Sequence, residues 1–411
     1  MRNPDKDFIG FLKDYYQPGM KVQLIEMNDP HAPKPGTKGV VTGVDDIGNI
    51  LVRWENGSSL SLIPKVDKWS EILKIKYIIN LLLVPFRANI HTRQRRAQEM
   101  KEKTIRQIEA IKEQTIGVEI EMAEITRRKA IGVVADYFGT RSSILHAGGG
   151  YDSWTCKDNQ GRTWTLMRDV SIVASSELKK AELVTPILTY EDIEDLQEIV
   201  RRLRKAGAIS NPQHGCGVHI HIGANGHTPA TLRNLANIMA SHEDLLIGAL
   251  NLDYTRVNRY AKTVDPDFLE RLNRKKPKTM AQLTDLWYAG QFGSRNAHYN
   301  NSRYRMLNLH ATFTKATVEF RLFQFDNPTA ERKGGLHAGQ LKAYIQLCLA
   351  LSQQAKDVKS ARSKPHQREN KKFAMRTWLL RLGFIGDEFK TARDVFTNRL
   401  DGDTAFRFGR P

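Results

Sequence analysis

Apolar and polar residues alternate strictly in three segments of the chain, IGVEIEM (116–122), GVHIHIG (217–223) and ATVEFRLF (316–323). Strict alternation predicts β-strands with one buried face, because successive side chains of a strand point to opposite sides of the sheet. In each segment the apolar residues share one face and ionisable residues share the other. We therefore expect three strands that pack with one face and carry chemistry on the other.

The same patterns divide the rest of the chain. Short alternating runs separated by Gly, Asn and Asp predict a small SH3-like β-barrel over residues 1–70. Charges at helical spacing predict a basic helical linker over 71–114. Strands and amphipathic helices alternate over 115–411, which indicates an α+β domain, interrupted by a polar and basic insert near 353–373.

Three helices are expected within the large domain. Apolar residues recur at helical spacing over residues 189–207, 228–250 and 374–384. The first of these ends at Gly207, as is typical of a helix C-terminus. After the third helix the composition predicts an irregular basic tail.

Composition places the chain among ordinary globular proteins. Of 411 residues, 40% are hydrophobic and 26% are charged. No apolar run approaches the roughly 18 residues that span a bilayer, and the N-terminus lacks the pattern of a secretory signal. The three cysteines are far apart, which argues against a disulfide framework and a zinc-binding pair. We expect a cytoplasmic protein without membrane contact.

Charge adds a second hypothesis about partners. Lys and Arg number 63 and Asp and Glu 45, which leaves a net charge of +18. Basic residues cluster over 87–112, 256–278 and 356–376. A surplus of this size favours polyanionic partners, so nucleic-acid or protein contact through the basic segments and the N-terminal barrel stays open. We expect most of these positions to be solvated helix faces and loops.

The ionisable faces of the three strands point to a metal site. Their residues are Glu119, Glu121, His219, His221, Glu319 and Arg321. If the strands share one sheet, these side chains converge on one surface, where neighbouring carboxylates repel one another unless cations compensate them. Ligands rich in oxygen with few nitrogens favour Mg²⁺ or Mn²⁺ over zinc. Asp169 and Glu182 lie between the first two strands in sequence, and each is either a further ligand or a surface acid.

The order of these motifs resembles the amidoligase family, a branch of the glutamine synthetase-like carboxylate–amine ligases. The matching features run over about residues 115–350: G-x-E-x-E, then D-x-S with E-L-V-x-P, then G-x-H-x-H, then E-F-R. The resemblance implies a curved antiparallel sheet of glutamine synthetase-like type with helices on its outer face. It also implies ATP and Mg²⁺ (or Mn²⁺), small-molecule or peptide substrates with carboxylate and amine groups, and an acyl-phosphate intermediate that leads to an amide or isopeptide bond.

The resemblance assigns metal ligands position by position. Glu121 and Glu182 match the ligands of one metal ion, and Glu119, His219 and Glu319 match those of a second. Glutamine synthetases supply a further glutamate near the position of Glu182. In this chain Asp169 or Glu177 would take that place, and we count Asp169 with the catalytic residues.

The remaining assignments concern the nucleotide and the transferred phosphoryl group. The resemblance places His221 and Lys315 near the nucleotide. Arg321 matches the residue that contacts the phosphoryl group or the substrate carboxylate, and Arg303 or Arg305 matches the arginine that precedes the last catalytic strand.

The N-terminal segment is similar to a short module found in proteins of phages and other mobile elements. The residues that carry this similarity are DPHAPKPGTKGVV and VDDIGNILVRWENGSSLSLIPKVDKW. Barrels of this kind bind nucleic acid or protein segments, so we expect a docking role.

Two other functions stay open on sequence alone. A metal-dependent hydrolase could use His219 and His221 as a ligand pair, and a nucleic-acid-binding protein would explain the basic clusters. The chain leads with Glu-x-Glu and closes with Glu-x-Arg, which favours the ligase. Substrate identity and oligomeric state have no signal in the sequence.

Overall fold

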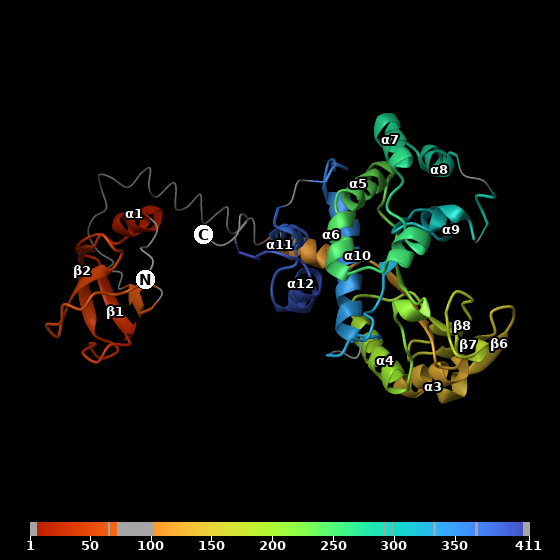
Figure 1. The fold of residues 1–411 in the computed structure, drawn as a ribbon, viewed down its shortest axis with the longest axis horizontal. Coiled ribbons are helices and arrows are strands. Elements are labelled where there is room, and N and C mark those ends of the chain that lie inside the picture. Colours follow the sequence, from red (N-terminus) through yellow and green to blue (C-terminus); the bar gives the residue numbers. More distant parts are fainter. Residues whose placement is uncertain are drawn as a thin grey trace. The chain divides into compact units, whose positions relative to one another are not determined.

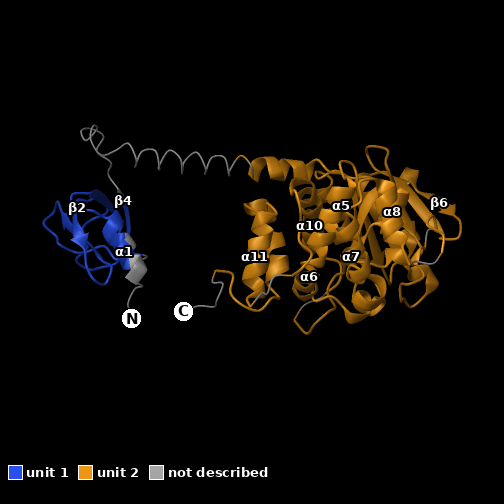
Figure 2. Cartoon of the chain, turned by 90° about the horizontal axis from the view of Figure 1, so that it is seen from above, with its two compact units in different colours: residues 1–95 blue, residues 96–411 orange. Residues whose placement is uncertain are grey.

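The computed structural model describes residues 6–64, 66–71, 102, 104–290, 293–297, 299–331, 334–365 and 369–405. The chain forms two compact units, residues 1–95 and residues 96–411 (Figure 2). Most of the expected linker, 71–114, lies outside the described residues. Its last part is a helix over residues 104–112 that belongs to the larger unit, where Ile111 is buried in the core.

Over its described residues, the smaller unit is a four-stranded antiparallel sheet with the helix α1. Its elements are α1 (Lys6–Tyr15), β1 (Lys21–Glu26), β2 (Lys38–Val44), β3 (Ile50–Trp54) and β4 (Lys68–Glu71), with the strand order β3-β2-β1-β4. Asp45 fixes the turn from β2 to β3, because its Oδ1 accepts hydrogen bonds from the backbone N–H groups of Ile47 (3.0 Å) and Asn49 (2.8 Å). Gly39 is required where it stands, since a Cβ there would lie 2.4 Å from the side chain of Val52. The expected small β module is confirmed as a sheet of four strands.

The larger unit is built on one eight-stranded sheet in which every neighbouring pair is antiparallel. Its strands are β5 (Ile116–Met122), β6 (Leu145–Gly148), β7 (Ser153–Lys157), β8 (Thr163–Met167), β9 (Ala181–Val184), β10 (Val218–Gly223), β11 (Leu307–Asn308) and β12 (Thr317–Phe323). They lie in the order β11-β12-β10-β5-β9-β8-β7-β6. An α+β fold with a large antiparallel sheet is therefore confirmed, and the three alternating segments are adjacent strands.

Ten further α-helices within the described residues surround this sheet. They are α3 (Arg127–Phe138), α4 (Ile193–Lys205), α5 (Pro229–Ala240), α6 (Glu243–Leu250), α7 (Pro266–Lys275), α8 (Met280–Tyr288), α9 (His310–Lys315), α10 (Ala338–Asp357), α11 (Lys371–Arg381) and α12 (Lys390–Thr397). The long helix α10 packs against β10. Helix α3 packs against β7 and β8 (Figure 1). Further helices, α4, α5 and α12, then cover α10, which makes it the most buried helix of the unit.

The structure corrects three helix boundaries. Residues 228–250 form two helices, because the side chains of Ser241 and His242 both bond to the backbone carbonyl of Ile238 (3.0 and 2.9 Å) and replace a helical hydrogen bond there. The tail expected to be irregular contains α12, which buries Phe396. The polar insert is shorter than 353–373, since α10 continues to Asp357 and α11 begins at Lys371.

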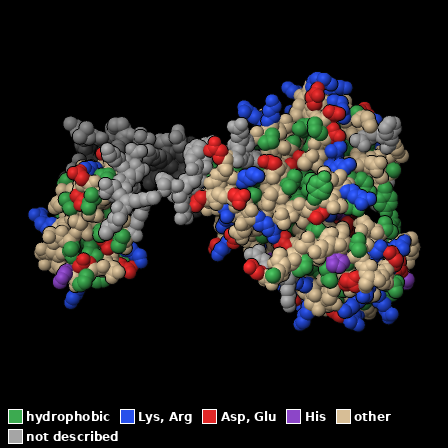
Figure 3. Space-filling view, viewed as in Figure 1, with side chains coloured by type: hydrophobic (Ala, Val, Ile, Leu, Met, Phe, Trp, Pro, Cys, Tyr) green, Lys and Arg blue, Asp and Glu red, His purple; other side chains and the backbone are tan. Residues whose placement is uncertain are grey.

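On the face of the larger unit that Figure 3 shows, Lys and Arg side chains form several separate groups and not one continuous surface. Within the segment 256–278, Arg256 is buried and Arg274 pairs with Glu270 at 3.2 Å. Of the helices in the described part of the chain, none has the length and apolar character needed to cross a membrane.

Candidate metal centre and surrounding site

The register of four adjacent strands brings the ionisable residues together. Strand β5 lies between β10 and β9, and β12 lies on the other side of β10. The pairs that lie directly opposite each other are Glu119 with His219, Glu121 with Glu182, and His221 with Glu319. Opposed residues of antiparallel strands share a face and have Cβ atoms about 5 Å apart. Residues from distant parts of the sequence therefore form one continuous cluster.

One end of this cluster is made of carboxylates alone. Ligand oxygens of Glu121, Asp169 and Glu182 lie within 4.8 Å of one another. Asp169 follows β8, and its Oδ1 accepts hydrogen bonds from the N–H and the hydroxyl of Ser171, both at 2.6 Å. Glu177, the other acid considered for this position, is exposed and pairs with Lys180 at 2.5 Å. The structure thus brings Asp169, and not Glu177, to Glu121 and Glu182.

The other end combines two carboxylates with an imidazole. Ligand atoms of Glu119, His221 and Glu319 also lie within 4.8 Å of one another. His221 Nδ1 bonds to Thr317 Oγ1 at 2.9 Å, which directs Nε2 toward Glu119 Oε1 (3.3 Å) and Glu319 Oε1 (3.9 Å). Among the described residues, none makes a hydrogen bond to this buried Nε2. A buried nitrogen that faces two carboxylates without a hydrogen bond is the geometry expected of a metal ligand.

His219 connects the two ends. Its Nδ1 lies 3.0 Å from Glu119 Oε2 and its Nε2 lies 3.7 Å from Glu121 Oε1, and it also forms a compact group with Glu119 and Glu182. Burial lowers the pKa of His219 and Arg321 lowers it further, so this imidazole is neutral, as a metal ligand must be. The sequence separated the roles of His219 and His221, whereas the structure brings both into the cluster.

The electrostatic balance of the cluster also fits a divalent cation. Burial raises the pKa of Glu182 well above its ordinary value, and the nearby Glu119, Glu121 and Asp169 raise it further. Burial acts in the same direction on Glu319, but Arg321 and His221 outweigh it and lower that pKa to about 2. Positive charge in the cluster would favour the ionised form of Glu182, and a cation bound between these carboxylates would supply it.

Glu319 is held from both sides. Its Oε1 accepts a hydrogen bond from Arg321 Nη1 at 2.5 Å, and its Oε2 accepts one from Asn308 Nδ2 at 2.6 Å. The guanidinium of Arg321 also lies over the ring of Tyr304, 5.8 Å from its centroid. The sequence did not single out Asn308. Its position directly opposite Glu319 in the β11–β12 pair explains its contact, and that register cannot be read from the chain.

Arg256 is a second residue that sequence reasoning missed. It is buried under the cluster, where its Nη2 donates to the backbone carbonyl of Arg321 at 2.6 Å. Its Nη1 lies 1.9 Å from where a Cβ on Gly217 would be, so a larger residue there would displace the guanidinium. The N–H of Gly217 in turn donates to Glu121 Oε2 at 2.6 Å. In the sequence Arg256 was one of several basic residues, and no local pattern separated it from them.

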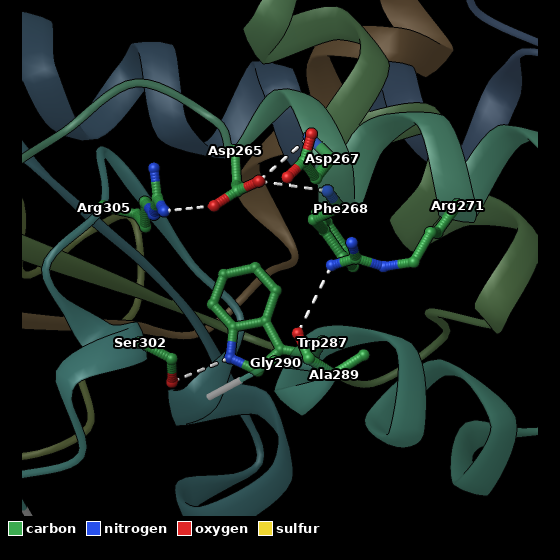
Figure 4. Close-up of a pocket in the computed structure, with 9 residues that line it drawn as sticks. All are labelled: Asp265, Asp267, Phe268, Arg271, Trp287, Ala289, Gly290, Ser302 and Arg305. Carbon is green, nitrogen blue, oxygen red and sulfur yellow. Dashed lines mark hydrogen bonds and ion pairs between the residues drawn. The ribbon is translucent and has the colours of Figure 1, made fainter. Parts of the chain in front are cut away.

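The arginines and the lysine expected near the nucleotide take two different positions. Arg303 and Lys315 line a cavity of 220 Å³ together with Asn308 and Glu319. Lys315 Nζ lies 3.8 Å from Glu119 Oε1, so this cavity opens onto the cluster. Arg305 points elsewhere and binds Asp265 Oδ2 (2.6 Å) and the carbonyl of Thr263 (2.9 Å) in a second cavity (Figure 4). The structure thus brings Arg303 to the site and leaves Arg305 outside it.

Comparison with known proteins agrees with the motifs. The profile of the family described as "Putative amidoligase enzyme" matches residues 112–352, and that of a "Domain of unknown function (DUF4314)" matches residues 5–72. No curated protein matched the chain. Among solved structures, the chain is similar to a bifunctional glutathione synthetase from Pasteurella multocida, with 12% sequence identity and a TM-score of 0.38. That match covers 72% of this chain and 48% of the synthetase, so the chain spans about half of its length.

The amidoligase profile covers more than half of the 411 residues and includes the cluster strands β5, β9, β10 and β12. The resemblance drawn from the sequence motifs is therefore confirmed, and the chain belongs to the amidoligase family.

Proposed function

We propose that this amidoligase is an ATP-dependent carboxylate–amine ligase. In this proposal the γ-phosphoryl group passes to a substrate carboxylate, and an amine then displaces phosphate to form an amide or isopeptide bond. The observation that carries the proposal is the cluster on one sheet face, in which three groups of potential ligands overlap. A chain of carboxylates and imidazoles of this kind suits the divalent cations that nucleotide phosphates require.

The cluster offers enough ligands for two cations, Mg²⁺ or Mn²⁺. We assign Glu121, Asp169 and Glu182 to one, and Glu119 and Glu319 with His219 or His221 to the other. Bound cations would neutralise charge on the phosphate oxygens. The oxygen-rich ligand set fits hard cations better than the zinc of a histidine-based hydrolase, which makes the hydrolase the weaker candidate.

Three basic side chains are placed to act on the substrates. Arg303 and Lys315 line the cavity beside the cluster, and Arg321 lies within the cluster next to Glu319. We propose that Lys315 and Arg303 bind phosphate oxygens. Arg321, which is rigidly held by Glu319, would stabilise the charge that develops on the transferred phosphoryl group or orient the substrate carboxylate.

The proposal extends to the fold and to the smaller unit. We propose that the large sheet is curved in the glutamine synthetase-like manner and that the smaller unit is an SH3-like barrel that docks the enzyme onto a partner. The bridge between Ile50 and Leu62, which returns the chain to β3 after the turn, supports the barrel. An enzyme that consumes ATP would work in the cytoplasm, and a module of this type is consistent with a phage or mobile element.

Nucleotide binding tests the proposal directly. Titration calorimetry of the full chain should detect ATP binding only when Mg²⁺ or Mn²⁺ is present. The variants Glu121→Ala and Glu319→Ala should weaken it about a hundredfold, because each removes a carboxylate from a proposed metal site. Glu177→Gln is the matched control, since Glu177 is a nearby acid outside the cluster.

Turnover provides the second readout. ADP release should depend on the simultaneous presence of a carboxylate and an amine substrate, and amino acids and short peptides are the first pairs to test. ATP binding that does not depend on metal, or no ATP binding, would contradict the proposal. Binding of duplex DNA with a strong salt dependence and no ATP binding would favour the nucleic-acid function instead.

A further inference from the structure

A second cavity lies between α7, α8 and the turn Ser302–Arg305 (Figure 4). Its volume is 160 Å³, and none of its lining residues belongs to the carboxylate cluster. The space is equivalent to about five water molecules at ~30 Å³ each. It is therefore suited to a small ligand, and the proposed ligase chemistry makes no use of it.

One wall of this cavity is aromatic. Phe268 and Trp287 are largely buried, and their rings meet edge to face with centroids 5.0 Å apart. The indole N–H of Trp287 already donates to Ser302 Oγ at 3.0 Å. Trp287 therefore presents its apolar ring to the cavity, and this wall can pack against a hydrocarbon side chain.

Two arginines reach the cavity from opposite sides (Figure 4), and they differ in how well they are satisfied. Arg305 is fully engaged, with Nη2 on Asp265 Oδ2 and Nη1 on the Thr263 carbonyl. Arg271 has a single long hydrogen bond, from Nη2 to the carbonyl of Ala289 at 3.4 Å. Its Nε is buried and has no hydrogen-bond partner in the described part of the chain. The guanidinium of Arg271 is therefore held by little within the protein and can bind an anion in the cavity.

The two aspartates that line the cavity differ in the same way as the two arginines, since one is paired within the protein and the other is not. The carboxylate of Asp265 pairs with Arg305 and accepts the N–H groups of Asp267 and Phe268 at the start of α7. Asp267 also lines the cavity, and no described residue forms an ion pair or hydrogen bond with its carboxylate. Arg305 and Asp265 thus form an ion pair with each other, whereas Arg271 and Asp267 are both available to a ligand.

We propose that this cavity binds a free amino acid as a zwitterion. The carboxylate of the amino acid pairs with Arg271, its ammonium group pairs with Asp267, and its side chain packs against Trp287 and Phe268. Arginine binds carboxylates through two parallel hydrogen bonds, and Arg271 uses only one weak hydrogen bond within the protein, from Nη2 to the Ala289 carbonyl. The four charged side chains of the lining sum to zero, so a ligand with one positive and one negative group leaves no charge uncompensated.

The position of the cavity links its ligand to the cluster through the turn Ser302–Arg305. Ser302 and Arg305 line this cavity, and Arg303, between them, lines the cavity beside Glu319. A ligand that holds this turn in place would therefore also hold Arg303. If so, the amino acid and ATP should influence each other's affinity by the same factor.

The test is titration calorimetry of the full chain with each common L-amino acid, without ATP or metal. At least one amino acid should bind, and its amide and its decarboxylated amine should bind about tenfold or more weakly because each lacks the carboxylate. Arg271→Gln and Asp267→Asn should weaken binding to a similar extent. Asp267 is exposed, so its variant keeps the fold even if the Arg271 variant does not.

Two control variants separate this proposal from the ligase proposal. Arg274→Gln removes an exposed arginine from the same helix and should leave binding unchanged. Glu182→Gln alters the carboxylate cluster, so it should affect ATP and metal but not the amino acid. Binding by none of the amino acids, wild-type affinity in both Arg271→Gln and Asp267→Asn, or loss of binding in Glu182→Gln would each overturn the proposal.

Discussion

The two faces of strands β5, β10 and β12 are buried to nearly the same degree but are stabilised by different interactions. On the face covered by helices, Ile120, Ile220 and Phe320 pack in the apolar core. On the other face, His219 and Glu319 are equally hidden, each 3% exposed. Burial stabilises the first face by about 25 cal/mol per Å² of apolar surface, whereas it penalises the second unless each charge is paired. One face therefore secures the sheet, whereas the other depends on the pairing of its charges.

The largest expected effect comes from the apolar face. Leu183 and Glu182 are neighbours on β9 that point to opposite faces, and Leu183 is completely buried. Leu183→Ala should lower the free energy of unfolding by about 2–5 kcal/mol, because it leaves a cavity in the core. Urea denaturation measures this loss. A loss below about 1 kcal/mol would contradict the view that this face secures the sheet.

A carboxylate outside the cluster tests the penalty for burial alone. Glu243 is buried, accepts one hydrogen bond from the N–H of Val264, and has its pKa raised by burial from 4.5 to about 7. An acid with a raised pKa in the folded state binds more protons there than when unfolded. Its contribution to stability is therefore full below about pH 4.5 and is lost as the pH rises through about 7.

Glu243→Gln should remove this pH dependence. Relative to the wild type, the variant should gain about 2–3 kcal/mol in the free energy of unfolding between pH 5 and pH 8. Denaturation of both proteins at the two pH values gives the difference. If the two proteins respond to pH in parallel, uncompensated burial of a carboxylate carries no cost here, and the contrast between the faces weakens.

The polar face should respond to substitution in the opposite way from Leu183. Glu182→Gln replaces a carboxyl group whose ionised form is disfavoured by burial and by the neighbouring carboxylates, so without metal the stability should stay within about 1 kcal/mol of the wild type or rise. The wild type should melt at a higher temperature in excess MgCl₂, because a cation that binds only the folded state stabilises it. The variant should lose that increase. Thermal melts with and without MgCl₂ measure both effects, and an undiminished increase in the variant would exclude Glu182 as a ligand.

The smallest effect on stability is expected at the edge of the polar face. Lys315 is 46% exposed and lies 3.8 Å from Glu119. Lys315→Ala should change the free energy of unfolding by no more than about 0.5 kcal/mol, as is usual for surface positions. The same variant should weaken ATP binding in the presence of Mg²⁺ by about tenfold, if Lys315 contacts a phosphate. Unchanged ATP affinity would remove Lys315 from the site.

Much of the polar face could be predicted from alternation alone. The two-residue period placed Glu119, His219 and Glu319 on the ionisable faces of their strands. The side of a strand to which a side chain points depends only on local backbone geometry. Alternation does not give the register between strands, so it could not show that Glu121 lies opposite Glu182 or that His221 lies opposite Glu319. Register depends on packing and on connections between distant strands.

Residues outside the strands show where sequence reasoning stops. Arg303 and Arg305 are two positions apart and looked equivalent, yet they line different cavities because the turn between Ser302 and Met306 has no regular period. Arg256 reaches the cluster from an irregular helical turn. In the sequence, the segment around it has the composition of an ordinary basic surface. Such contacts depend on the path of a loop, which no local pattern encodes.

The strand order also determines when the site can form. Strand β12 is the last strand of the sheet in sequence, but it lies inside the sheet between β10 and β11 and supplies Glu319 and Arg321. A nascent chain that has not yet passed residue 323 has the other ligands but lacks this wall of the site. Closing the long loop between β10 and β12, which pair directly, is among the most entropically costly steps of assembling the sheet. Metal binding should therefore appear late in synthesis and refolding, and it can serve as a signal that the sheet is complete.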